Sequence, residues 1–151
     1  MKASGTKMRT LLRRALPSDA TAPGLARRAL GELPPPLGVD PADLRLMVSE
    51  LVTNSVRHAQ AAPSERIELD IFEMGAGIHV EVRDPGSGYA SVAKALGVIR
   101  VLPRSEETSA EGGFGLLVVA DLADRCGARW DGGTVTWFEL DRDEGAARNE
   151  S

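Results

Sequence analysis

The chain has 151 residues, 42% of them hydrophobic, and a formal net charge of −4. This length supports one ordinary domain with its own core, and the acidic balance argues against direct binding of nucleic acid. Cys126 is the single cysteine, which excludes an internal disulfide and fits a reducing compartment. The sequence has no signal peptide and no long apolar run, so we expect a cytoplasmic protein that makes no membrane contact.

The first half of the chain predicts one strand and two helices. Ser18 or Asp19 is a suitable cap for the first helix, and Asp40 with Pro41 has the sequence of a helix start for the second. Three successive prolines between the helices exclude regular structure there. The predicted ranges are 8–16 for the strand, 18–30 for the first helix and 40–60 for the second.

The second half predicts two β-hairpins with a helix between them. Apolar residues alternate on either side of a glycine-rich turn, which is typical of a hairpin. The predicted elements are a hairpin at 66–84, a helix at 114–126 that contains Cys126 and stops at Gly127, and a hairpin at 128–140. The order β-α-α-β-β-α-β-β predicts a two-layer α/β sandwich, with a mixed, mostly antiparallel sheet and the helices on one face. We expect residues 1–7 to be flexible and residues 142–151 to form a disordered tail.

The first motif is SELVTNSVRH, in the second helix. Glu50, Asn54 and His58 are four residues apart, so they share one stripe at the border of the apolar helix face. Such a stripe can line a cleft, or it can be a solvated edge, which is the commoner case. For His58, a packed structural role is the more frequent one.

The second motif is DPGSG, at the end of the first hairpin. Asp84 has the same strand parity as Ile78, Val80 and Val82, so its carboxylate should point toward the core and requires donors there. The exocyclic amine of an adenine is one suitable donor, and the two glycines after Asp84 would let a flat base approach the backbone. The alternative is a plain Asp-Pro-Gly turn, which is very common.

The third motif is EGGFGLL, which leads into the third helix. Free backbone N–H groups and the positive dipole end at a glycine-rich helix N-terminus suit a phosphate. The alternative is ordinary loop glycines. The motif is not a Walker A sequence, because no Gly-Lys-Ser/Thr follows it.

The order of these motifs, followed by GTVTWFEL, resembles the GHKL ATPase superfamily over residues 8–141. Within it, the short chain and LRLMVSELVTNSVRHA look most like the anti-sigma-factor serine/threonine kinases. The resemblance implies a Bergerat-type ATP-binding fold, ATP and Mg²⁺ as ligands, and a lid over residues 89–112. The content and length of this loop predict that it is mobile, and its apolar piece Val98–Leu102 is expected to pack in the core or on a partner.

The resemblance also implies a role for each matching residue. Asn54 would bind Mg²⁺ through its amide oxygen, and Glu50 would be the general base that takes the proton of an attacking hydroxyl. The other matches are Asp84 for adenine, Gly86 and Gly88 for the first glycine box, Gly113 and Gly115 for the second box against the phosphates, and Thr134 as support for the aspartate and adenine.

The implied partners are a sigma factor, which the protein would sequester, and an anti-anti-sigma protein of the STAS type, whose serine it would phosphorylate. A homodimer is also expected. One departure weakens the kinase interpretation: Glu111 stands where such kinases often carry an arginine, and a carboxylate repels a triphosphate. The alternative is a nucleotide-binding partner-switch module without phosphotransfer.

Overall fold

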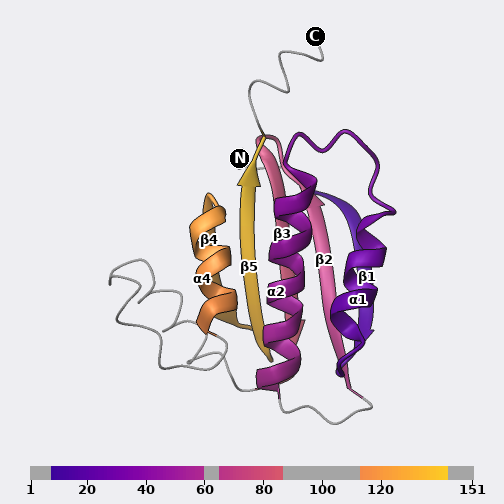
Figure 1. Ribbon diagram of the computed structural model, residues 1–151, viewed down its shortest axis with the longest axis vertical. Coiled ribbons are helices and arrows are strands. Elements are labelled where there is room, and N and C mark those ends of the chain that lie inside the picture. Colours follow the sequence, from indigo (N-terminus) through magenta and orange to yellow (C-terminus); the bar gives the residue numbers. More distant parts are fainter. Residues whose placement is uncertain (1–7, 60–64, 87–112, 143–151) are drawn as a thin grey trace.

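The computed structural model describes residues 8–59, 65–86 and 113–142. Figure 1 shows two layers, a twisted sheet and a layer of helices. The elements in chain order are β1 (Arg9–Pro17), α1 (Ala22–Leu30), α2 (Pro41–Ala59), β2 (Arg66–Glu73), β3 (Gly77–Asp84), α4 (Gly113–Leu122), β4 (Arg125–Trp130) and β5 (Thr134–Asp141). The predicted lid at 89–112, including Val98–Leu102 and Glu111, lies outside the described residues, as do residues 1–7 and 143–151.

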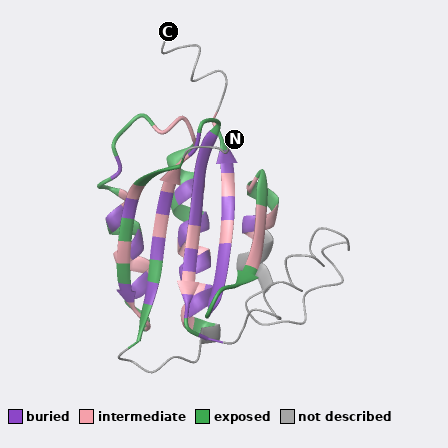
Figure 2. Cartoon of the chain, turned by 180° about the vertical axis from the view of Figure 1, so that it is seen from behind, coloured by how far each residue is buried: buried purple, intermediate pink, exposed green. Residues whose placement is uncertain are grey.

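The sheet has five strands in the order β1-β2-β3-β5-β4, and each neighbouring pair is antiparallel. The three labelled helices lie over one face of it (Figure 1). Seen from behind, the other face has no described helix over it (Figure 2). The predicted two-layer α/β sandwich is therefore confirmed, and the pairing within the described strands is entirely antiparallel. None of the helices in the described ranges is long and apolar enough to cross a membrane.

The core lies between α2 and the sheet. α2 contacts α1 on one side and α4 on the other, and it crosses β2 and β3 (Figure 1). Complete burial of each aliphatic side chain contributes roughly 1.5–3 kcal/mol relative to exposure. The fully buried side chains include Leu16, Met47, Val48, Leu51, Val52, Ile67, Leu69, Ile71, Ile78, Val80, Val82 and Phe138.

The start of α2 is as predicted, whereas α1 starts later. Asp40 caps α2 by accepting the N–H groups of Ala42 at 2.8 Å and Asp43 at 3.4 Å. The Asp19 carboxylate instead accepts the backbone N–H of Thr21 at 2.8 Å, in a turn before α1. α1 therefore begins at Ala22, four residues after the predicted start.

The predicted end of the third helix is wrong. α4 ends at Leu122, and Cys126 and Gly127 belong to strand β4. The chain joins the sheet directly after the helix, because the backbone N–H of Asp124 donates to Glu139 O at 3.0 Å. Gly127 is a close-packing residue and not a helix stop: a Cβ there would lie 2.9 Å from the ring of Trp137.

Candidate functional site

The polar stripe of α2 points into the molecule at Asn54. The side chain of Asn54 is buried, with 5% of its surface exposed, and Glu50, one turn earlier, is half-buried. His58 lies one turn later in the helix, but its side chain is outside the described part. The part of the predicted stripe that is described therefore lies at the border between the core and the surface, as the spacing predicts.

Asn54 has a buried oxygen that needs a partner. No described group donates a hydrogen bond to Asn54 Oδ1. A buried polar atom left in this way costs roughly 1–3 kcal/mol, which is consistent with an atom held for a ligand. The side-chain oxygen of the neighbouring Ser55 also lacks a described partner.

Asp84 ends β3 with its side chain turned toward the helix layer. It is 4% exposed, as its shared parity with Ile78, Val80 and Val82 predicts. Its Oδ1 accepts the backbone N–H of Gly86 at 2.8 Å. The carboxylate is thus buried and held by the first glycine of DPGSG. Gly88, the second of these glycines, lies outside the described residues.

Thr134 completes the arrangement from the neighbouring strand. It is 1% exposed and lies directly opposite Asp84 in the β3–β5 pairing. Its Oγ1 donates to Gly86 O at 3.1 Å. Asp84, Gly86 and Thr134 therefore form one buried polar cluster at the end of the sheet, on the side that α2 and α4 cover.

The sequence interpretation did not identify Gly133, although GG before Thr134 signals a close approach. A Cβ at Gly133 would lie 2.4 Å from the backbone oxygen of Asp84. The turn between β4 and β5 therefore lies directly against the end of β3. Glycine at this position keeps the Asp84–Thr134 cluster compact.

The glycines of the third motif lie at the N-terminus of α4, with Gly113 as its first residue and Gly115 in its first turn. This end of the helix is at the same end of the molecule as the C-terminal half of α2 (Figure 1). The side chains of residues 113–117 are outside the described part. The positions agree with a helix N-terminus that lies at the same end of the molecule as the buried Asp84, Gly86 and Thr134 cluster.

The donor set fits a magnesium ion better than a transition metal. No cluster of three or more His, Cys, Asp or Glu side chains suited to a metal occurs in the described residues. Magnesium needs few protein ligands, because it keeps several waters and takes phosphate oxygens. A single neutral amide oxygen, Asn54 Oδ1, is an appropriate protein ligand for an ion held mainly by phosphates.

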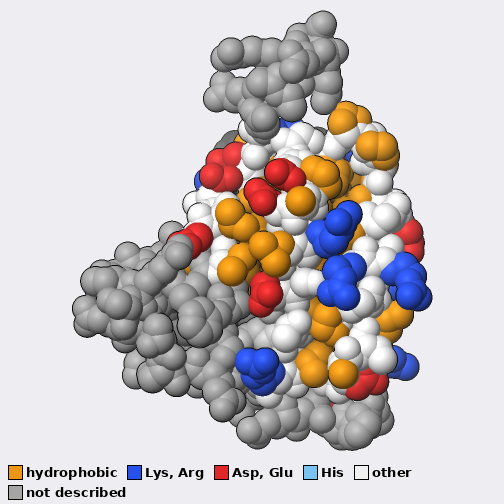
Figure 3. Space-filling model, in the orientation of Figure 1, with side chains coloured by type: hydrophobic (Ala, Val, Ile, Leu, Met, Phe, Trp, Pro, Cys, Tyr) orange, Lys and Arg blue, Asp and Glu red, His pale blue; other side chains and the backbone are white. Residues whose placement is uncertain are grey.

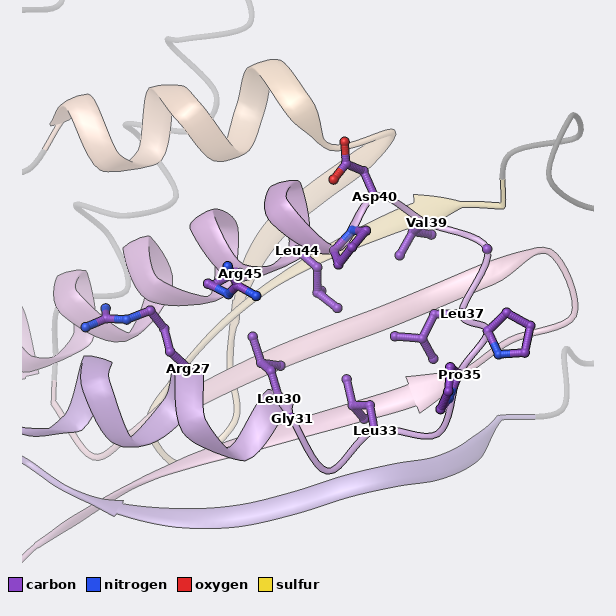
Figure 4. Close-up of a pocket in the computed structure, with 13 residues that line it drawn as sticks. Arg27, Leu30, Gly31, Leu33, Pro35, Leu37, Val39, Asp40, Leu44 and Arg45 are labelled. Carbon is purple, nitrogen blue, oxygen red and sulfur yellow. The ribbon is translucent and has the colours of Figure 1, made fainter.

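A cavity of about 650 Å³ lies at the opposite end of α2 and does not belong to this site. It is formed by the end of α1, the loop that follows and the start of α2, with aliphatic walls and two arginines, Arg27 and Arg45 (Figure 4). The one carboxylate among the lining residues, that of Asp40, is already used as the cap of α2. The cavity contains none of the predicted site residues.

The uncovered sheet face carries a separate charge cluster around His79. Its Nε2 lies 2.8 Å from Glu81 Oε2, and its Nδ1 lies 2.8 Å from Glu139 Oε2. Burial lowers the pKa of His79, but the hydrogen bonds to both glutamates outweigh this, and the pKa is raised. The hydrogen bond from His79 lowers the pKa of Glu81 to about 2. Two carboxylates on one ring favour the imidazolium, which donates from both nitrogens.

Comparison with known proteins agrees with this geometry. Residues 3–140 match the family described as histidine kinase-like ATPase domain. The sensor-type histidine kinase PrrB of Mycobacterium leprae (strain TN) is 34% identical over 83 residues, which are 55% of this chain and 18% of that protein. This chain therefore matches less than a fifth of that relative's length. A chain of the SiaB–SiaC complex from Pseudomonas aeruginosa shares the fold, with a TM-score of 0.61 and 16% identity, over 87% of this chain and 90% of that one. The chain belongs to the family of histidine kinase-like ATPase domains.

Proposed function

We propose that this protein binds Mg–ATP and uses it to regulate a sigma factor through partner switching. The observation that carries the proposal is the buried cluster of Asp84, Gly86 and Thr134 at the sheet end, beside the buried amide of Asn54. The Asp84 carboxylate suits the exocyclic amine of adenine. Gly86 and Gly88 would allow the base to lie against the backbone, and Thr134 would support both the aspartate and the base.

The phosphates would extend from this cluster toward α2 and α4. Asn54 would hold Mg²⁺ through Oδ1, and the ion would neutralise charge on the phosphate oxygens. The N-terminus of α4, with Gly113 and Gly115, would donate backbone N–H groups to the phosphates. The two helices would therefore fix the triphosphate between them.

The chemical step we propose is transfer of the γ-phosphoryl group to a serine of an anti-anti-sigma protein of the STAS type. Glu50 accepts the proton of the serine hydroxyl, whose oxygen forms a bond to the γ-phosphorus. The bond between that phosphorus and the bridging oxygen of ADP breaks, and ADP leaves. The added phosphate changes the charge of the partner's interface, so docking changes with it.

Four arginines on the helix layer support a surface for an acidic partner. Within the part of the chain that the structure describes, every strand arginine except Arg66 forms an ion pair, whereas the arginines of α1 and α2 form none. Basic side chains are visible on this layer in Figure 3. We name this set of four arginines the basic face. Asp43 and Glu50 of α2 lie on the same layer, and the arginines favour binding of a negatively charged segment. The four residues are Arg27, Arg28, Arg45 and Arg57.

The similar chain from Pseudomonas aeruginosa was solved in a complex, SiaB with SiaC, which supports protein partners for this fold. We propose the sigma factor as the occupant of the basic face, and a homodimer as the functional unit. Charge reversal at Arg45 should weaken sigma capture more than tenfold at low salt. Reversal at Arg13, which pairs with Asp70 on β2, is the control and should not.

The second candidate is a nucleotide-dependent binding module without phosphotransfer. Glu111 favours it, because a carboxylate near the triphosphate would oppose the charge development of transfer. The two candidates are distinguished by one paired experiment: calorimetry with Mg–ATP, and phosphate transfer to the cognate serine protein. Binding with transfer supports the kinase, binding without transfer supports the module, and the absence of binding contradicts both.

A further inference from the structure

Trp130, the last residue of β4, is the most exposed large hydrophobic residue in the described part, with 55% of its surface exposed. The others are Met8, Leu46 and Leu122, at 45%, 43% and 37%. Single exposed hydrophobic side chains are ordinary on protein surfaces. Trp130 differs from the other three because it lies close to residues of the candidate site.

The strand register places Trp130 in one row with two site residues. Trp130 pairs with Thr134 across β4 and β5, and Thr134 pairs with Asp84 across β5 and β3. Neighbouring strands are about 4.8 Å apart, so the backbones of Trp130 and Asp84 are separated by roughly 10 Å.

The side chain of Trp130 lies on the same face of the sheet as Asp84. Side chains alternate along a strand, and Cys126 and Ala128, which share the parity of Trp130, pack against the core on the helix side. The intervening residue Arg129 points to the other face, where it pairs with Glu81. Trp130 therefore borders the cleft in which the nucleotide is proposed to bind.

The turn that follows Trp130 is held in place. Arg83 forms an ion pair with Asp131, at 2.9 Å between Nη2 and Oδ2, and also donates to the Asp131 backbone oxygen. The Asp131 N–H donates to Gly133 O at 3.0 Å. These bonds fix the backbone of the turn next to Trp130 before any ligand arrives, which reduces the backbone entropy lost on contact.

We propose that Trp130 is an aromatic wall of the nucleotide cleft and packs against the base end of bound ATP. This inference rests on the proposed function. The contact is at the base end because Trp130 is level with Asp84, the proposed adenine acceptor, whereas Asn54 is on α2. Aromatic contact with a base adds dispersion and excludes water from the Asp84 hydrogen bond, which strengthens it.

The test uses the two tryptophans of the chain as separate probes. Trp137 is on the opposite face, stacked on His79 with ring centroids 5.6 Å apart, so it serves as the control. In the Trp137→Phe protein, Mg–ATP should change the Trp130 emission, and the change should saturate at the calorimetric Kd. In the Trp130→Phe protein, the Trp137 emission should not change.

Affinity gives the second readout. Trp130→Ala should weaken Mg–ATP binding about three- to tenfold, and Trp130→Phe should retain most of the affinity. The thermal midpoint without nucleotide should stay at the wild-type value in both variants, because the side chain is exposed. Wild-type protein that binds no Mg–ATP in calorimetry would defeat the proposed function, and this inference with it. Wild-type protein that binds, with either Trp130 readout unresponsive, would overturn this inference and leave the proposed function standing.

Discussion

Asp84 and Thr134 lie at directly paired positions of β3 and β5, and both are tied to Gly86. Asp84 accepts the N–H of Gly86, and Thr134 donates to its carbonyl oxygen, at 2.8 and 3.1 Å. These two bonds fix the backbone after β3 relative to both side chains. In the proposed site, a ligand whose donor matches this fixed carboxylate would bind better than a ligand without that donor.

The first prediction concerns the charge of Asp84. Asp84→Asn keeps the shape of the side chain but replaces the carboxylate that we propose as the acceptor for the adenine amine with a neutral amide. Binding of Mg–ATP should weaken by roughly 1–3 kcal/mol, measured by calorimetry. Asp70→Asn, on β2, is the matched control and should bind as wild type does. Equal affinity for Asp84→Asn and wild type would contradict the adenine role.

The second prediction compares two adjacent glycines. Gly133→Ala introduces a Cβ 2.4 Å from the Asp84 backbone oxygen, so the end of β3 has to move. A Cβ added at Gly132 would meet no atom within 4 Å beyond its chain neighbours. Only the positive φ of Gly132, +69°, opposes an alanine there. Gly132→Ala should cost about 1 kcal/mol of stability and leave ATP affinity unchanged. Gly133→Ala should lower both the stability and the affinity.

These variants are compared by denaturant unfolding and calorimetry on the same preparations. The informative quantity is the ratio of the two affinities. If Gly132→Ala weakens ATP binding as much as Gly133→Ala does, the close approach of Gly133 to Asp84 is not what shapes the site.

The third prediction is a pH dependence of stability from His79. The pKa of His79 in the folded protein is raised above the usual 6.5. Its contribution to the free energy of unfolding is therefore complete below pH 6.5 and is lost as the pH rises through the pKa of the folded state. The pKa values of Glu81 and Glu139 are lowered from 4.5, so their contribution is lost as the pH falls below 4.5 toward the folded values. The cluster should therefore stabilise most between about pH 4.5 and 6.5.

The measurement is the free energy of unfolding of wild type and His79→Gln from pH 4 to pH 9. The groups that face His79 are Glu81 and Glu139, with Arg129 and Arg125 behind them. The difference between the two proteins should shrink as the pH rises above 6.5. A difference that stays constant across this range would show that the imidazolium is not the stabilising form.

The sequence predicts those parts of the fold that depend on local signals. The alternation of apolar side chains in β3 is enough to predict that the Asp84 side chain points toward the core. The start of α2 is also a local signal, because Asp40 caps the helix just before Pro41. The end of α4 is different, because a hydrogen bond from Asp124 to β5 decides it. The alignment of Trp130 with Asp84 likewise depends on the register of three paired strands. The sequence of β4 alone therefore cannot predict it.

The last prediction separates binding from chemistry at Glu50. Asn54 is one turn further along α2 and is the proposed metal ligand, whereas Glu50 is half-buried and carries a charge that repels phosphate. Glu50→Ala should therefore keep or tighten ATP affinity, while phosphate transfer falls by about 10²–10⁴-fold, the usual contribution of a general base. Asn54→Ala should lose both, because the metal site is lost with it. Glu68→Ala, exposed on β2, is the control for both assays.

The paired design makes each outcome specific, since affinity and transfer are measured on the same variant. Transfer by Glu50→Ala at the wild-type rate would show that Glu50 is not the base. Loss of ATP affinity in Glu50→Ala would instead place Glu50 in the binding site. If wild type binds Mg–ATP but transfers no phosphate to its serine partner, Glu111 is the first residue to change. Glu111→Arg should then restore transfer if its carboxylate is what opposes charge development on the phosphoryl group.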